Sequence, residues 1–203
     1  MDHSFIITRR RPRSVWAAVA PVSATLALGL LLGTGFTPPV QAKDASAVVE
    51  RGRVLVTSMG CNDCHTPWKL GPNGPEPDMT RMLSGHPESL VMPAPPAMPM
   101  PWGIAAAASF TAWSGPWGVS YTANLTPDPE TGLGSWSEED FLSALRSGRH
   151  MGRGRPILPP KPVQNFAALT DDDVRAIYGY LKSIPPIRNR VPDPLPPATT
   201  GEK

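Results

Sequence analysis

Hydrophobic and polar positions repeat with helical spacing in three stretches of the chain, and each stretch stops near a glycine or a proline. The first stretch predicts a helix over residues 45–59. Gly52 lies within it and marks a point where another element can approach closely. The apolar face of this helix is formed by Val48, Val49, Leu55 and Val56. An apolar stripe of this kind predicts a helix that packs on a hydrophobic core.

Two further helices are predicted towards the end of the chain. One follows Ser137, whose hydroxyl is expected to cap the helix while Asp140 reaches back, and it stops at Gly148. The other follows Thr170 and stops before Pro185, with three aspartates in its first turn, where negative charge is favourable. Their apolar stripes are Phe141, Leu142 and Leu145 in one, and Val174, Ile177, Tyr178 and Leu181 in the other.

Proline interrupts the regular patterns in two places. An insert over about residues 68–118 is rich in proline and methionine, and a proline-rich segment follows the last predicted helix. Because proline lacks a backbone N–H, the insert is predicted to be irregular, and residues 191–203 are predicted to be a flexible tail. A few residues around Val119 to Tyr121 carry the only strand-like pattern. The expected body between these segments is small and helical.

The first forty-two residues have the composition of an export signal. Four arginines between residues 9 and 13 precede an almost uncharged stretch over 15–36, and small residues follow at Val40 to Ala42. We expect a secretory signal peptide that is cleaved after Ala42. An uncleaved membrane anchor is the alternative, because the apolar stretch is just long enough to span a bilayer.

The chain has two cysteines, and they stand in a Cys-x-x-Cys-His sequence formed by Cys61, Cys64 and His65. This motif in an exported chain is the signature of covalent c-type haem attachment. Two thiols three residues apart can each bond one vinyl group of a porphyrin, and the imidazole of the next residue can then bind the iron. A thioredoxin-like pair would need a preceding strand, and a zinc site would need more ligands than the chain offers.

Net charge excludes a nucleic-acid partner once the export segment is set aside. The whole chain has a formal charge of +2, from 19 basic and 17 acidic side chains. Residues 1–42 contain four arginines and one aspartate, which leaves 15 basic against 16 acidic side chains in the mature chain. A nearly neutral chain gives no general attraction for the phosphate backbone.

The mature sequence resembles the class I c-type cytochromes, in particular the bacterial branch that includes cytochrome subunits of periplasmic dehydrogenases. The resemblance rests on the stretches Gly60–Pro67, Leu83–Glu88, Trp113–Gly118, Asn124–Asp128, Thr131–Gly134 and Leu169–Asp171. It implies a small all-α fold over residues 43–190 around one covalently attached haem c. It also implies that the first and last helices cross, with Gly52 and either Tyr178 or Tyr180 at the crossing.

The resemblance also bears on residues around the haem edge. It implies that Asn124 binds the cofactor, by a hydrogen bond to a propionate. Four arginines at positions 146, 149, 153 and 155 form a local basic cluster. For this cluster a solvated loop, a propionate clamp and a docking patch all remain open.

The sixth iron ligand departs from the family pattern. The family has Leu-Pro-Pro-Met-Pro before its last helix, whereas this chain has Lys161 at the methionine position. A lysine binds iron only as the neutral amine, so Lys161 is one candidate ligand. Met151 is the alternative donor, and His150, His86 or a methionine of the insert remain open. An iron with an open sixth position is a further possibility.

The function expected from the sequence is therefore that of a periplasmic monohaem cytochrome. It would carry single electrons between a dehydrogenase or an upstream cytochrome and a terminal acceptor, without catalysing a reaction of its own. Two alternatives remain: a haem sensor or peroxidase-like protein with an open or labile sixth position, and a fixed relay subunit of a redox complex. Redox proteins are the expected partners, and membrane association is expected only if the N-terminal segment is retained.

Overall fold

The computed structural model describes residues 40–197. Its α-helices are α1 (Val40–Ser58), α2 (Cys61–His65), α3 (Glu138–Ser147), α4 (Val163–Ala167) and α5 (Asp171–Ser183). Two short 3-10 helices, η1 (Met79–Arg81) and η2 (His150–Gly152), lie in the connecting segments. Most of the predicted export segment and the last six residues of the predicted tail lie outside the described residues.

The three predicted helices are present as α1, α3 and α5, and local capping explains both ends of α3 and the start of α5. The Ser137 hydroxyl accepts a hydrogen bond from the Asp140 N–H, and the Asp140 carboxylate accepts one from the Ser137 N–H. Gly148 ends α3 in the left-handed conformation at φ 66°. At α5 the Thr170 hydroxyl accepts from the Asp173 N–H at 3.1 Å. These caps satisfy backbone donors that the first turn of a helix leaves free.

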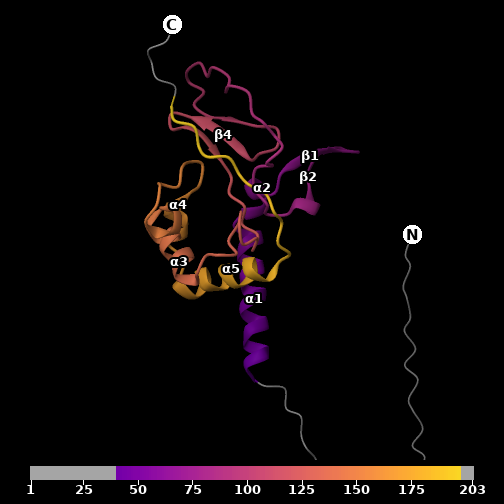
Figure 1. The fold of residues 1–203 in the computed structure, drawn as a ribbon, viewed down its shortest axis with the longest axis vertical. Helices are drawn as coiled ribbons and strands as arrows, with labels where there is room; N and C mark the ends of the chain where they lie inside the picture. The colour runs from indigo at the N-terminus through magenta and orange to yellow at the C-terminus, as the bar shows by residue number, and fades with distance from the viewer. Residues whose placement is uncertain (1–39, 198–203) are drawn as a thin grey trace, which may run out of the picture. The chain divides into compact units, whose positions relative to one another are not determined.

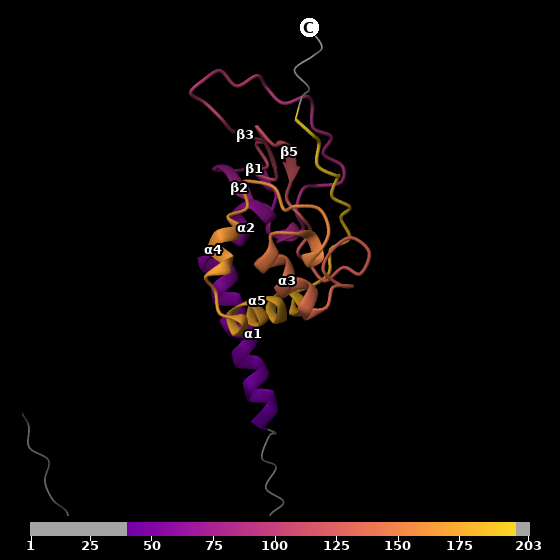
Figure 2. The same ribbon diagram turned by 90° about the vertical axis from the view of Figure 1, so that its left-hand side faces the viewer.

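Helices α1 and α5 cross, as Figures 1 and 2 show. Gly52 of α1 lies at the contact with α5. A Cβ atom at Gly52 would overlap the carbonyl of Ala176 and would lie 2.8 Å from the Cβ of Tyr180. The crossing implied by the family resemblance is therefore confirmed for Gly52 and Tyr180. The absence of a side chain at residue 52 lets the two backbones approach, and this contact fixes the frame of the domain.

The expectation of an all-α fold is wrong. Two antiparallel sheets lie within and directly after the predicted insert: β1 (Trp68–Gly71) with β2 (Gly74–Pro77), and β3 (Ala105–Ala106) with β4 (Ala112–Gly115) and β5 (Gly118–Tyr121). Of these strands, β5 contains the strand-like pattern at Val119 to Tyr121. In the second sheet β4 is central, and it pairs Ala112 with Tyr121 of β5. Residues 82–104 between the sheets contain no helix or strand. The fold is therefore helical around the core with a small β addition.

Prolines do not exclude these strands because of where they stand. Pro75 and Pro77 lie in β2, which pairs only with β1 in the described residues. A two-stranded sheet has an open edge on each side, so a missing N–H that faces outwards costs no ladder hydrogen bond. Short strands of two to four residues also show too little alternation to be recognised in a sequence.

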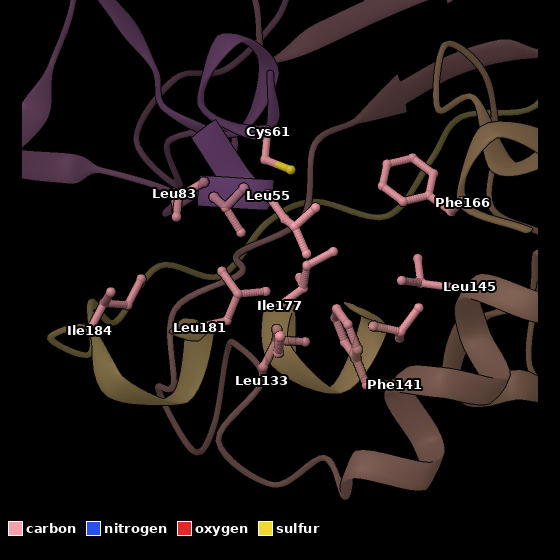
Figure 3. Packing of buried hydrophobic residues seen from close by; sticks show 13 residues of the cluster. Leu55, Cys61, Leu83, Leu133, Phe141, Leu145, Phe166, Ile177, Leu181 and Ile184 are labelled. Carbon is pink, nitrogen blue, oxygen red and sulfur yellow. The ribbon is translucent and has the colours of Figure 1, made fainter. Parts of the chain in front are cut away.

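The hydrophobic core lies where α1, α3 and α5 meet the loops before α3. Figure 3 shows side chains from these elements directed towards a common interior. The buried cluster includes Leu55, Leu83, Leu133, Phe141, Leu145, Phe166, Ile177 and Leu181. Cys61 is part of the same cluster. The first residue of the cysteine motif therefore faces the core.

The segment after α5 is hydrogen-bonded to β5 and to residues 84–88. The N–H groups and carbonyls of Val119 and Leu195 pair with each other, at 3.0 Å and 2.9 Å. The sequence predicts a flexible tail from residue 191, whereas Leu195 is hydrogen-bonded to β5. Asn189 is only 1% exposed, and its amide donates to the carbonyls of Ser84 and His86 and accepts from the Glu88 N–H. Asn189 thus joins the C-terminal segment to the base of the insert.

We expect Asn189→Ala to lower the free energy of unfolding by about 2 kcal/mol, because it leaves buried backbone groups without partners. Denaturant unfolding of the haem-loaded protein measures the change. Asn165→Ala is the matched control, because Asn165 is exposed on α4. Equal stability of the two variants would show that the Asn189 amide contributes nothing to the fold.

Candidate haem site

The Cys-x-x-Cys-His motif forms the short helix α2 directly after α1. Gly60 precedes it in the left-handed conformation, with φ 67°, and turns the chain from α1 into α2. Behind the motif, the Thr66 N–H donates to the carbonyl of Asn62, and the Gly85 N–H donates to the carbonyl of His65 at 2.7 Å. These bonds hold the motif between α1 and the loop around residue 85.

One face of the motif borders a cavity of about 380 Å³. Cys61, Cys64 and His65 all line it. Other parts of the cavity wall come from the segment that contains Lys161 and from α3, α4 and α5. The apolar wall includes Leu133, Phe141, Leu145, Phe166, Ile177 and Leu181, which are also members of the core cluster. The core of this domain is therefore built around the cavity instead of filling it.

The His65 ring is oriented by the backbone. Its Nδ1 lies 2.8 Å from the carbonyl oxygen of Ala123. A carbonyl oxygen only accepts hydrogen bonds, so Nδ1 carries the proton and Nε2 keeps its lone pair. Burial, and secondarily the charge of Lys161, lower the pKa of His65 to about 3. A neutral imidazole with a free Nε2 and a hydrogen-bond partner on Nδ1 is the form that binds metals in proteins.

Both thiols of the motif are free. Cys61 is buried and Cys64 is partly exposed. Burial raises the pKa of both thiols. They lie on the cavity wall with His65, so all three side chains of the motif could hold a porphyrin in the cavity.

Lys161 lies on the cavity wall. Its Nζ stands 4.0 Å from the centre of the Phe166 ring, and among the described residues it makes no salt bridge. Burial lowers the pKa of its ammonium. Burial therefore shifts Lys161 towards the neutral amine, which is the form that can bind a metal.

Other predicted site residues are placed away from the cavity. Met151 does not line it, and Met59 is the only methionine of the described residues that does. His86 is fully buried, with Nδ1 2.9 Å from the Thr111 hydroxyl and Nε2 2.9 Å from the Leu90 carbonyl. Both His86 nitrogens are therefore already engaged within the fold.

Asn124 also lies outside the cavity lining. Its amide donates to the carbonyl of Ile187 at 2.8 Å and to the Thr131 hydroxyl, and its oxygen accepts from the N–H and the hydroxyl of Thr126. The side chain thereby ties the loop before α3 to the segment after α5. The contacts that Asn124 makes in the described residues are structural.

The cavity is also lined by residues to which the sequence assigned no role in the site, and by His150, which the sequence left open as an iron ligand. Thr122 lines the cavity, and its hydroxyl is buried without a hydrogen-bond partner among the described residues. Tyr121 and Trp113 line it from β5 and β4. Trp136 packs edge-on against His150, with ring centres 4.8 Å apart, and both line the cavity. The sequence signal that could have pointed to this part of the wall is the position of Thr122, two residues before the predicted site residue Asn124.

The basic cluster is divided by the fold. Arg146 donates to the carbonyls of Phe166 and Leu169 and pairs with Asp171, so it fastens α4 to α5. Arg153 pairs with Asp140. Arg155 lines the cavity, and its side chain makes a long hydrogen bond, 3.5 Å, to the carbonyl of Pro156. Arg155 is therefore the member of the cluster placed to meet an anionic group of a bound cofactor.

The residues present fit a haem. The cavity offers an apolar wall for a porphyrin face, two free thiols and one oriented imidazole. The unpartnered Thr122 hydroxyl supports this fit, because a buried hydroxyl without a partner costs free energy unless a bound group satisfies it.

Comparison with known proteins decides the family. No protein-family model matches the sequence. The chain is 31% identical over 191 residues to the cytochrome c subunit of alcohol dehydrogenase (quinone) from Komagataeibacter europaeus, a match that covers 92% of this chain and 32% of that protein. It is 42% identical over 81 residues to the corresponding subunit from Gluconobacter oxydans, covering 38% of this chain and 17% of that protein.

The chain belongs to the c-type cytochromes. One of the subunits of nicotinate dehydrogenase from Pseudomonas putida is also similar, with 32% identity over 156 residues, 77% of this chain and 10% of that protein. This cytochrome thus spans between about a tenth and a third of the length of the relatives it matches. Its similarity lies within the dehydrogenase-associated branch.

Proposed function

We propose that this cytochrome carries single electrons between a dehydrogenase or an upstream cytochrome and a terminal acceptor, and that it is not itself the catalytic subunit. What carries the proposal is that Cys61, Cys64, His65 and Lys161 all line one apolar cavity. The names of the relatives support it, because several are cytochrome c subunits of dehydrogenases.

Each residue has a defined task in this proposal. The Cys61 and Cys64 thiols would hold the cofactor by two thioether bonds. His65 would offer Nε2 to the iron, and the Ala123 carbonyl holds the ring by its Nδ1. When bound, haem supplies a one-electron iron couple. The apolar side chains of the core exclude water from its faces, which limits the reorganisation that accompanies a change of charge.

We assign one haem to this chain, because one Cys-x-x-Cys-His motif uses both of its cysteines. A protein from Cereibacter sphaeroides that is named a dihaem cytochrome c is 33% identical over 69 residues, 34% of this chain. Haem content per chain, measured by pyridine haemochrome absorbance against protein concentration, tests the assignment. A ratio near two would overturn it.

We place the mature protein outside the cytoplasmic membrane, because residues 1–42 have the pattern of an export signal. No helix within residues 40–197 is long and apolar enough to cross a membrane. Mass spectrometry of the N-terminus of protein purified from the periplasm tests the location and the cleavage after Ala42 together. An N-terminus at Met1 in the membrane fraction would instead support the anchored form.

The alternative class is a sensor or peroxidase-like protein with an open sixth position, and one observation favours it. Met59, just before the cysteine motif, is the only methionine of the described residues on the cavity wall, so no methionine from another segment is placed there as a sixth ligand. Absorption spectra of the ferric and ferrous protein, with and without carbon monoxide, separate the two classes. A low-spin ferrous spectrum unchanged by carbon monoxide supports the carrier. Rapid binding of carbon monoxide would support the sensor.

We expect Lys161→Met to raise the reduction potential by on the order of 100 mV, within the roughly 0.8 V range that axial ligands set. The physical reason is that an amine stabilises ferric iron, whereas a thioether favours the ferrous state. Potentiometric titration of the loaded protein measures the shift.

Two further variants distinguish a ligand from a neighbour. Lys161→Ala is expected to open the sixth position and allow carbon monoxide to bind. Met151→Ala is the matched control and is expected to leave the spectrum unchanged, because Met151 does not line the cavity. If instead Met151→Ala altered the ligation and Lys161→Ala did not, Met151 would be the ligand.

A further inference from the structure

Exposed hydrophobic side chains are concentrated in one part of the molecule. Of the eleven large hydrophobic side chains that are exposed in the described residues, six lie between residues 90 and 110. We call them the neutral surface: Leu90, Val91, Met100, Trp102, Ile104 and Phe110. Val91 and Met100 are 87% and 88% exposed, and Trp102 is 70% exposed. Large exposed apolar areas are rare on proteins that act alone and mark interaction sites.

The charge pattern of this segment is as unusual as its exposure. Residues 89–127, thirty-nine in a row, contain no aspartate, glutamate, lysine, arginine or histidine. Lysine and arginine are absent over the longer stretch 82–145. The segment that carries the neutral surface therefore offers neither sign of charge to a partner. Only an uncharged, apolar counterpart gains free energy by covering it, because a charged one would lose hydration without gaining an ion pair.

The neutral surface lies next to the wall of the haem cavity. Trp113 lines that cavity and also a separate apolar groove of about 80 Å³. Residues 92–96 of the insert form one side of this groove, and β3 and β4 contribute to the other. The Phe110 ring of the neutral surface packs against Trp113, with centres 6.2 Å apart. A partner on this surface would be separated from the cavity by the Trp113 side chain.

The base of the insert is fixed. The carbonyl of Leu90 lies 2.9 Å from Nε2 of the buried His86, and the Glu88 N–H donates to the Asn189 oxygen at 2.8 Å. At the far side of the insert, β3 joins the sheet with β4. The exposed side chains are therefore carried on a segment anchored at both ends, which lowers the entropy lost on binding.

We propose that the neutral surface is the docking site for a redox partner protein that presents an uncharged, apolar face. This inference rests on the proposed electron-transfer function and specifies where exchange takes place. A lipid surface fits the observations less well, because peripheral membrane binding uses lysine and arginine beside apolar side chains. In addition, α1 begins at the end of the domain opposite β4 (Figure 1).

Voltammetry of the full, haem-loaded chain on monolayer-coated gold tests the proposal with a defined partner surface. We expect electron exchange on a methyl-terminated monolayer that changes less than about twofold between about 10 mM and about 500 mM salt. On carboxylate- and amine-terminated monolayers we expect exchange at least about tenfold slower. Faster exchange on either charged monolayer would overturn the proposal.

Substitutions test whether the contact with the methyl-terminated monolayer lies at the neutral surface. Val91→Glu and Trp102→Glu are each expected to slow exchange on the methyl-terminated monolayer about tenfold. Leu70→Glu is the matched control, since Leu70 is 84% exposed on β1 and lies outside the neutral surface. It is expected to leave the rate unchanged. An equal loss in all three variants would show that the contact is not localised at the neutral surface.

Two further measurements test the proposed electron-transfer function and membrane binding separately from the docking proposal. Reduction of each variant in solution by dithionite, followed spectroscopically, reports on the attached haem alone, so its failure would count against the proposed function and not against the surface. Co-sedimentation with phosphatidylcholine vesicles is expected to be negligible. Vesicle binding that Trp102→Glu abolishes would assign the surface to a membrane and overturn the protein partner.

Discussion

Replacing Cys61 and Cys64 together by alanine is expected to give a chain that carries no covalently bound haem. Each thiol provides one thioether bond, and the chain has no other cysteine to replace them. The cavity would then hold a porphyrin only by apolar contacts and His65, and haem would be lost on denaturation. Haem staining after denaturing electrophoresis measures the result, and we expect complete loss of the stained band.

The single variants are the controls for this result. Cys61→Ala and Cys64→Ala each leave one thiol on the cavity wall, so some haem should remain attached through a single bond. Covalent haem in the double variant would contradict the assignment of the motif and with it the proposed function. A lower yield of stained protein in the single variants is compatible with the assignment, because one bond retains less haem during maturation.

The sequence predicts the helices of this domain well because their signals are local. Ser137 and Asp140 stand three residues apart and form the cap that begins α3. Thr170 caps α5 in the same way. A capping residue followed by an apolar stripe is contained within a dozen residues, so no distant part of the chain is needed to recognise it.

The strands of the insert were missed because their partners determine them. Ala105 and Ala106 form β3 only by pairing with Ser114 and Trp113 of β4. Neither alanine has a preference for strands, and two residues are too few to show alternation. Sheet formation there depends on contacts between separate segments, and these are not visible in a local pattern.

The site was predicted only in part, because some of its residues form a local motif and the others are brought together by the fold. Cys61, Cys64 and His65 form a local motif, and its spacing alone indicates attachment of a cofactor. The rest of the cavity wall is assembled from separate segments. The sequence therefore could not decide whether Lys161 or Met151 is the sixth ligand, and it could not place Asn124. Only the folded chain brings Lys161 to the cavity and directs the Asn124 amide to Ile187.

The crossing of α1 and α5 is the structural feature whose disturbance we expect to cost most. Gly52→Val is expected to lower the free energy of unfolding by about 3 kcal/mol or more. The new side chain would overlap the Ala176 carbonyl and the Tyr180 Cβ, which belong to the α5 backbone or are fixed to it. The helices would have to separate, and the cavity wall formed by α5 would move with them. Denaturant unfolding of the haem-loaded protein measures the loss.

Gly179→Ala provides the control on the opposite helix. Gly179 lies in α5, and an added Cβ there would meet only the Val48 Cγ1, at 4.0 Å, which is an ordinary contact. Alanine is favoured over glycine inside a helix by roughly 0.5–1 kcal/mol, so this variant should be as stable as the natural protein or slightly more so. If both variants were equally stable, the close approach at Gly52 would not set the packing of the helices. If only Gly52→Val is destabilised, the glycine is needed for the approach that fixes the α5 wall of the cavity in front of the cysteine motif.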